Sequence, residues 1–184
     1  MNKKVIIIDM GCGRNKIKPK NKDEIILGLD KFKLDCVDII CDLERGLPLK
    51  DNSVDIVVAN NILEHIKNFF QIIEEMWRVT KPEGILKIIV PHFSSEKAFT
   101  NPDHKRFFGC FSFDYFLPNH PENYYTKARF KILKRKLVFI GNPKYKFLNK
   151  IFNPIANFNQ IFFEKFLFKF LSMDDIRLEL KVVK

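Results

Sequence analysis

Two glycines and two acidic residues near the N-terminus are spaced as a nucleoside-binding site requires. Gly11 and Gly13 closely follow the apolar run 5–8 and Asp9, after Met10. Glycine lets the backbone turn sharply and brings main-chain N–H groups close to a ligand. Asp30 ends the next apolar run, 19 residues beyond Gly11, near the spacing of about 20 at which an acid meets ribose hydroxyls. These residues predict a nucleoside-like ligand at the end of a first strand.

The residues around this turn exclude two kinds of phosphate-binding loop. A dinucleotide fingerprint has a third glycine three residues after the second, to seat the pyrophosphate, but Lys16 stands there. A triphosphate-binding loop needs Gly, four residues and then Gly-Lys followed by Ser or Thr, and the sequence holds no such run. The ligand expected here therefore has no pyrophosphate.

Short β-branched runs alternate with polar connections, which is typical of a mostly parallel α/β sheet. We predict an α/β, Rossmann-like fold: an open, mostly parallel twisted sheet of about seven strands, with helices on both faces and an antiparallel C-terminal strand. The expected strands are 5–9, 25–30, 37–41, 54–59, 85–90, 130–139 and 176–182.

Apolar periodicity predicts two long helices, and a short connection predicts a loop where another helix would usually lie. Residues 63–79 repeat apolar side chains every three or four positions, as a half-buried helix does. The Phe-rich stretch 157–171 is the second helix, and 111–116 is a short one. Only eleven residues separate Gly13 from Ile25, so we expect a loop where a crossover helix would usually lie.

The charge divides the chain into two unlike halves. The whole chain of 184 residues has a formal net charge of +10 and 20 Phe; residues 93–184 hold 17 of the 32 Lys+Arg, 8 of the 22 Asp+Glu and 17 of the Phe. We predict one domain over 1–184, with a cofactor-binding half at 1–91 and a basic, Phe-rich acceptor-side half at 92–184.

Targeting and redox signals are weak. No apolar run is long enough to span a membrane, and the N-terminus leads directly into the first strand without a secretory signal. The four cysteines show no CxxC spacing, so neither a disulfide framework nor a zinc site is indicated. We expect a cytoplasmic protein with reduced thiols.

Five sequence pieces in register with these strands resemble the class I S-adenosylmethionine-dependent methyltransferases, in particular the small single-domain kind with a Leu-Glu-His-Ile element. The resemblance covers roughly residues 5–91 and weakens through 92–116. The pieces that carry it are Asp9-Met10-Gly11-Cys12-Gly13, Asp30, Cys41-Asp42-Leu43, Leu63-Glu64-His65-Ile66 and Trp77-Arg78-Val79-Thr80-Lys81-Pro82-Glu83-Gly84.

The resemblance implies S-adenosylmethionine as the cofactor and assigns residues to its parts. Gly11, Cys12 and Gly13 would pass under the methionine, Asp9 would shape the turn, and Asp30 would hold the ribose hydroxyls.

In the same way, Asp42 and Leu43 would flank the adenine, and Asn60 would lie near the amino acid part or the sulfonium. Asp9 and Asp30 also have an ordinary structural interpretation as strand-end acids, and Asp42 likewise need not contact the cofactor.

Methyl transfer from a sulfonium is an in-line displacement, so alignment supplies much of the rate. A base is needed only where the acceptor carries a proton, and a histidine is the natural candidate. His104 and His92 are the hypothetical bases; the alternative is that they hydrogen-bond loop backbone. Glu64 and His65 either touch a ligand or only pack at a helix start. No metal site is predicted, because the histidine and acid spacing matches no familiar pattern.

The second half leaves the acceptor open. The helical Phe162, Phe163, Phe166, Leu167 and Phe170 most simply cover the sheet, although flanking lysines also fit a membrane surface or a lipid-linked substrate. Basic side chains from Arg129 to Lys146 fit phosphates of RNA or another anionic acceptor.

The main hypothesis is an S-adenosylmethionine-dependent methyltransferase acting on an oxygen or nitrogen of a small-molecule acceptor. The alternatives are an RNA-binding methyltransferase with an anionic acceptor and a catalytically inactive cofactor-binding module. Nucleic acid and peripheral membrane contact stay open as partners, and the sequence does not determine an oligomeric state.

Overall fold

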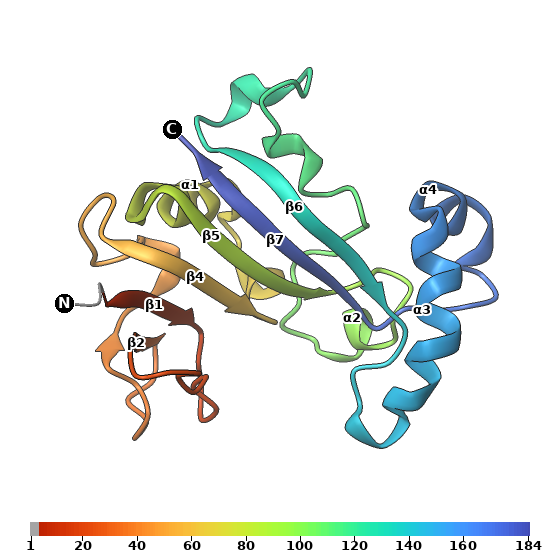
Figure 1. Cartoon of the computed structure of the whole chain (residues 1–184), viewed down its shortest axis with the longest axis horizontal. Helices are drawn as coiled ribbons and strands as arrows, with labels where there is room; N and C mark the ends of the chain where they lie inside the picture. The colour runs from red at the N-terminus through yellow and green to blue at the C-terminus, as the bar shows by residue number, and fades with distance from the viewer. Residues whose placement is uncertain (1–3) are drawn as a thin grey trace.

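A single seven-stranded sheet organises the chain in a computed structural model, which describes residues 4–184 (Figure 1). The strand order is β3-β2-β1-β4-β5-β7-β6; the first five strands are parallel, and β7 runs antiparallel to both β5 and β6. The predicted α/β sheet is therefore confirmed. The strands are β1 (Val5–Met10), β2 (Glu24–Asp30), β3 (Ile39–Ile40), β4 (Val54–Asn60), β5 (Thr80–Pro91), β6 (Arg129–Val138) and β7 (Asp175–Val183).

The helical segments are mostly short. The α-helices are α1 (Phe69–Val79), α2 (Lys97–Thr100), α3 (Asn149–Phe158) and α4 (Gln160–Phe162). Single turns of other helix types are η1 (Leu43–Arg45), η2 (Leu63–His65), η3 (Asp114–Phe116), η4 (Asn123–Tyr125), η5 (Pro143–Leu148) and η6 (Phe163–Leu167). No helix lies between β1 and β2, as the short connection predicts.

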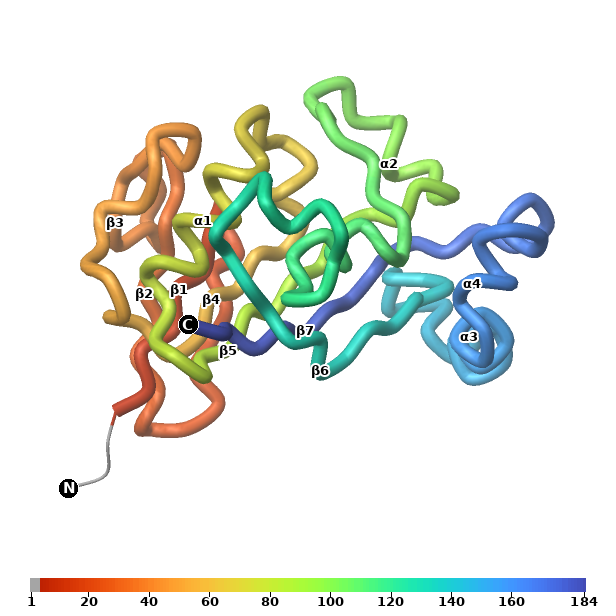
Figure 2. The backbone as a smooth tube through the Cα atoms, turned by 90° about the horizontal axis from the view of Figure 1, so that it is seen from above, coloured from red at the N-terminus to blue at the C-terminus, as the bar shows by residue number. Residues whose placement is uncertain are grey.

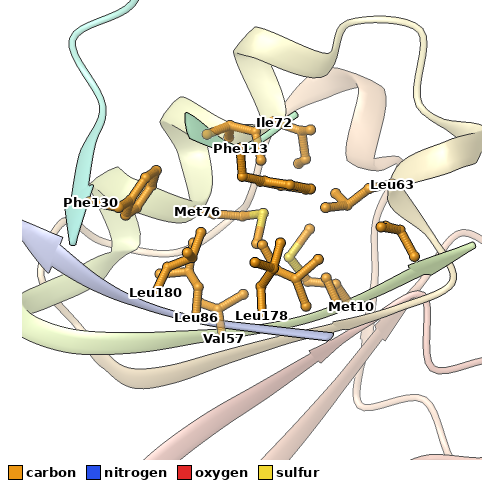
Figure 3. Packing of buried hydrophobic residues seen from close by; sticks show 14 of the residues in the cluster. Met10, Val57, Leu63, Ile72, Met76, Leu86, Phe113, Phe130, Leu178 and Leu180 are labelled. Atoms are coloured by element: carbon orange, nitrogen blue, oxygen red, sulfur yellow. The ribbon is translucent and has the colours of Figure 1, made fainter. Parts of the chain in front are cut away.

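The core fills the space between the sheet and α1 (Figure 3). Ile72 and Met76 of α1 are buried against strand residues that point to the same face. Phe113 from the loop after β5 closes this layer and is also fully buried. The strands contribute Met10, Val57, Leu86, Leu178 and Leu180 to the same cluster.

The opposite face of the sheet is covered only at its ends. The connection from β1 to β2 lies at one end, and α3 lies at the other, beside β6 (Figure 2). Asn153 and Asn157 of α3 accept hydrogen bonds from the Phe139 and Leu137 backbone at 2.7 and 2.8 Å. A groove of about 730 Å³ runs between these ends, across β1, β4, β5, β7 and β6. Seven cationic residues line it: Lys18, Lys20, Lys87, Lys134, Lys136, Lys146 and Arg177.

Two predicted helix boundaries are wrong, and side-chain hydrogen bonds lie at both breaks. The helix predicted over 63–79 is only η2 and α1, and in the segment between them the Glu44 carboxylate accepts the backbone N–H groups of Lys67 and Asn68 at 2.7 and 3.1 Å. The helix predicted over 157–171 is divided at Asn159, whose extended backbone ends α3 and whose side chain accepts from the Phe162 N–H.

Phenylalanines after β6 do not all cover the sheet. Phe163 is fully buried, but Phe162, Phe166 and Phe170 are exposed, so the prediction of a covering helix is wrong for these three. None of the helices within residues 4–184 has the length and apolar character that a membrane span requires.

Candidate functional site

The turn after β1 requires glycine for two different reasons. Gly11 and Gly13 have φ values of +63° and +52°, which side chains rarely tolerate. A Cβ on Gly11 would lie 2.5 Å from Cδ1 of Ile62, so the turn packs directly against the segment after β4. A Cβ on Gly13 would meet nothing within 4 Å. Gly13 therefore faces open space at the carboxyl edge of the sheet.

Asp30 is held against this turn from the end of β2. One carboxylate oxygen accepts the Gly13 N–H at 2.9 Å, and the other accepts the Phe32 N–H at 3.0 Å. Each oxygen of a carboxylate can accept a further hydrogen bond. The side chain is buried, yet it keeps acceptor capacity for a ligand's hydroxyl groups beside Gly13.

Asp9 and Cys12 support the turn from within. The Asp9 carboxylate accepts the Ile17 N–H at 2.8 Å and so ties down the loop that replaces the first helix. Burial raises the pKa of Asp9, and the Ile17 hydrogen bond and Lys16 oppose that rise. Burial, with smaller contributions from nearby acids, raises the pKa of the Cys12 thiol to about 11, so the thiol stays neutral at physiological pH.

The remaining predicted cofactor residues follow β3 and β4. Asp42 caps η1 by accepting the Glu44 N–H at 3.1 Å. Leu43 is buried in the hydrophobic core. Asn60 ends β4 and lines the groove on the open face of the sheet. Asp42 thus caps a turn and Leu43 packs in the core, whereas Asn60 lines an open groove.

Glu64 carries the most unusual environment of the charged side chains in η2. Its side chain is 1% exposed, and within residues 4–184 neither carboxylate oxygen has a hydrogen-bond partner. Burial raises the pKa of Glu64 to about 7. Buried polar groups normally have partners, so this carboxylate is an exception that a structural role does not explain.

Two histidines lie beside Glu64 and are oriented through the same ring nitrogen. Nδ1 of His65 lies 3.0 Å from the Asp103 carboxylate, and Nδ1 of His104 lies 3.0 Å from the Ala98 carbonyl oxygen. The two rings meet edge to face with centroids 4.7 Å apart. The loop that carries His104 is fixed to η2, because the Lys105 N–H donates to the Glu64 carbonyl at 2.8 Å.

His92 lies in a different and fully buried environment after β5. Its Nε2 is 3.1 Å from the Glu164 carboxylate, and its Nδ1 is 2.7 Å from Oγ of Ser94. Both ring nitrogens are thus engaged within the protein. Of the two predicted bases, His104 is the one that keeps a nitrogen without a protein partner among the described residues.

An aromatic cavity of about 390 Å³ adjoins the His104 loop. This volume falls in the range of small-molecule pockets, which combine apolar walls with a few polar groups. Lys105 and Arg106 supply the polar part, and Ser112 adds a hydroxyl. The aromatic wall is made of Phe69, Phe70, Phe107, Phe108, Tyr115 and Phe116.

The structure brings the glycine turn and Asp30 together at one edge and joins His104 to His65. The sequence alone leaves the roles of Glu64 and His65 open and predicts no cluster between them and His104. The Leu-Glu-His-Ile element was the available signal. The missing information was the contact between η2 and a loop 40 residues later, which β5 and α2 create.

Comparison with known proteins gives this geometry a family context. The profile of a family described as a hypothetical methyltransferase matches residues 1–115. An uncharacterized protein of Methanocaldococcus jannaschii is 29% identical over 182 residues, which cover 85% of this chain and 77% of that protein.

Solved structures agree at the level of the fold. A SAM-dependent methyltransferase from Aquifex aeolicus has a TM-score of 0.56 at 14% identity, covering 98% of this chain and 84% of that one. The [4+2]-cyclase SpnF has a TM-score of 0.63 at 17% identity, covering 100% of this chain and 76% of that one. Since the fold also carries a cyclase, the fold by itself does not define the reaction. The profile match, over more than half of the sequence, places the chain in this methyltransferase family.

Proposed function

We propose that the protein transfers a methyl group from S-adenosylmethionine to an oxygen or nitrogen of a small-molecule acceptor. The observation that carries this proposal is the pairing of Gly13 and Asp30. Gly13 faces open space, and a buried carboxylate with spare acceptor capacity lies 2.9 Å from its N–H. This arrangement suits a nucleoside whose ribose hydroxyls donate to Asp30.

The chain's own residues would bind and align the cofactor, which supplies an electrophilic methyl group on its sulfonium when bound. Gly11, Cys12 and Gly13 would lie under its methionine part, with Asp9 holding the turn through Ile17. Asp42 and Leu43 would border the adenine, and Asn60 the amino acid part. Alignment of two bound reactants can supply about 7–11 kcal/mol of the barrier reduction.

The acceptor would enter from the second half of the chain. The aromatic cavity adjoins the loop that contacts η2, and its wall is apolar with two cations. An acceptor with an aromatic or apolar body and a polar end fits these walls. His104, with a free nitrogen at this loop, is the proposed base for an acceptor that carries a proton.

A second candidate acceptor is anionic, such as RNA. The specific observation in its favour is the groove of about 730 Å³ on the open sheet face. Its lining contains seven cationic residues and two acidic ones, Glu24 and Glu179. Phosphate contacts of this kind make binding fall steeply with salt. RNA binding that is the same at 50 and about 200 mM salt would rule out this acceptor.

Calorimetry with S-adenosylhomocysteine tests the cofactor assignment. Asp30→Ala removes hydrogen bonds to a charged acceptor, which are worth about 1.5–3 kcal/mol, so the dissociation constant should rise about 10- to 150-fold. Asp35→Ala, at an exposed acid five residues later, is the matched control and should bind as the wild type does. Equal affinity of the Asp30 variant and the control would remove Asp30 from the site.

Turnover separates an enzyme from an inactive binding module. The wild type is incubated with methyl-labelled cofactor and fractionated cell extract, and the fraction that takes up label identifies the acceptor. Tight S-adenosylhomocysteine binding with no label in any fraction would favour the binding module.

A further inference from the structure

Three side chains at the junction of η2 and the His104 loop form a cluster that the proposed cofactor site does not use. Glu64, His65 and His104 each offer one ligand atom, and these atoms lie within 4.8 Å of one another. Three ligand atoms spread around one ion at about 2.0–2.2 Å lie about 3.3–3.8 Å from one another. A closing movement of at most about 1–1.5 Å between the ligand atoms would therefore bring all three onto one ion.

The hydrogen bonds at Nδ1 leave Nε2 of each histidine as the nitrogen available to a metal. The Ala98 carbonyl can only accept, so Nδ1 of His104 carries a proton, and a metal would bind to Nε2 of the neutral ring. Asp103 orients His65 in the same way through Nδ1. Metal-bound histidines almost always donate their other N–H to a carboxylate or a backbone carbonyl, and this cluster shows one of each.

The state of Glu64 points independently to a missing partner. A carboxylate that is 1% exposed, with two oxygens that accept nothing within residues 4–184, costs the fold free energy. Lys105 and Arg106 do not neutralise it, because Lys105 pairs with Asp103 and Arg106 donates to the Ile66 and Lys67 carbonyls. A cation at the cluster would satisfy the carboxylate.

We propose that Glu64, His65 and His104 together bind one divalent transition-metal ion. Two imidazoles and one carboxylate are the donor set of zinc sites with an open position and of non-haem iron sites. Three protein ligands leave at least one coordination position for a water molecule or for an oxygen of a bound compound. The site is therefore suited to substrate binding as well as to structure.

The location gives the ion a role that rests on the proposed methyl transfer. Ile62, two residues before Glu64, lies against Gly11, so one short segment runs from the cofactor turn to the cluster. An ion here would bind an acceptor hydroxyl and lower its pKa, so its proton leaves to water. The oxygen then forms a bond to the methyl carbon as the carbon–sulfur bond breaks and its electrons return to sulfur. With an ion bound, His104 would be a ligand, and water would take the proton that His104 is proposed to accept in the metal-free site.

Metal binding is measured without cofactor on protein first stripped with a chelator. Zn²⁺ affinity is obtained by competition with a chromophoric chelator, and Co²⁺ reports the ligand set through its visible absorption. We expect one ion per chain. Glu64→Gln, His65→Ala and His104→Ala should each weaken binding more than about 100-fold, and Asp103→Asn about 10- to 100-fold.

His120→Ala is the matched control, since His120 lies outside the cluster and contacts Tyr115 and the Glu122 backbone. It should bind Zn²⁺ like the wild type, and circular dichroism and a thermal melt check the fold of each variant. A wild type that takes up no ion, or folded cluster variants that bind like His120→Ala, would overturn the inference. If Zn²⁺ binds but the Asp30 calorimetry fails, the metal site stands and the proposed function falls; the opposite pair of results removes only the metal site.

Discussion

Two histidine–carboxylate pairs follow the same sheet edge and differ in what they leave unused. His92 and Glu164 lie in a buried region where both ring nitrogens have partners and the same carboxylate also accepts the Cys110 N–H. His65 of the η2 cluster pairs with Asp103 through one nitrogen, and among residues 4–184 neither its other nitrogen nor the carboxylate of the neighbouring Glu64 has a hydrogen-bond partner. Both pairs consist of a histidine and a carboxylate, but His92 has hydrogen-bond partners at both ring nitrogens and His65 at only one among the described residues.

Complete hydrogen bonding of a buried group, rather than its residue type, therefore separates structural from functional groups in this chain. A buried polar network with every member satisfied rigidifies a fold, and a partly satisfied one costs free energy unless a ligand completes it. Substitutions near His92 should therefore lower the stability of the fold, and substitutions in the η2 cluster should mainly weaken ligand binding.

The largest effect should come from the aromatic side chain that covers the buried pair. Phe163 is fully buried, with its ring centroid 6.0 Å from that of His92, so Phe163→Ala should lower the free energy of unfolding by about 3–5 kcal/mol. Phe99, which is 64% exposed and stacks on Phe107 near the other cluster, is the control. Phe99→Ala should cost less than about 1 kcal/mol. Urea unfolding measures the free energy of unfolding of both variants. An equal loss of stability in the two would show that the two regions do not differ in this way.

Histidine replacement tests the comparison directly. His92→Ala removes a fully buried ring and leaves Glu164 with one fewer donor, so we expect a loss of about 3 kcal/mol. His65→Ala removes a partly exposed ring whose partner, Asp103, can turn to water, so we expect about 1 kcal/mol or less. Chemical unfolding in the presence of a chelator gives both values. A reversal of this order would contradict the assignment of roles.

A satisfied glutamate on α1 sharpens the contrast with Glu64 through pH. Glu75 accepts two hydrogen bonds from Arg78 at 2.6 and 2.7 Å and one from the Leu47 N–H at 2.8 Å. The Arg78 hydrogen bonds, ahead of the Leu47 bond, lower the pKa of Glu75 from its usual 4.5. The carboxylate therefore stabilises the fold fully above pH 4.5 and loses this contribution as the pH falls through its lower folded-state pKa.

Glu75→Gln should accordingly cost about 1 kcal/mol at pH 7, a figure reduced because both partners are partly exposed. Unfolding free energies of the wild type and the variant are measured from pH 7 downwards. The difference between them should shrink below pH 4.5, and a constant difference would show that Glu75 acts through packing instead of charge.

Much of the fold follows from local patterns. The apolar runs before Gly11 and Asp30 became β1 and β2, and the eleven residues after Gly13 proved too few for a helix. Helix boundaries were harder, because the Glu44 carboxylate holds the backbone just before α1 from 23 residues away. A hydrogen bond from a distant residue cannot be read from the local sequence pattern.

Sequence patterns were enough to predict the strand segments, the glycine turn, Asp30 at the end of the second strand and the methyltransferase resemblance, because these depend on short-range geometry and spacing. The order of the strands in the sheet, the full hydrogen bonding of His92, the burial of Glu64 without a side-chain partner among residues 4–184 and the contact of the His104 loop with η2 came only from the folded structure. The reason is physical: desolvation and hydrogen-bond satisfaction depend on groups brought together from distant parts of the chain. The same packing left one sheet face as an open basic groove.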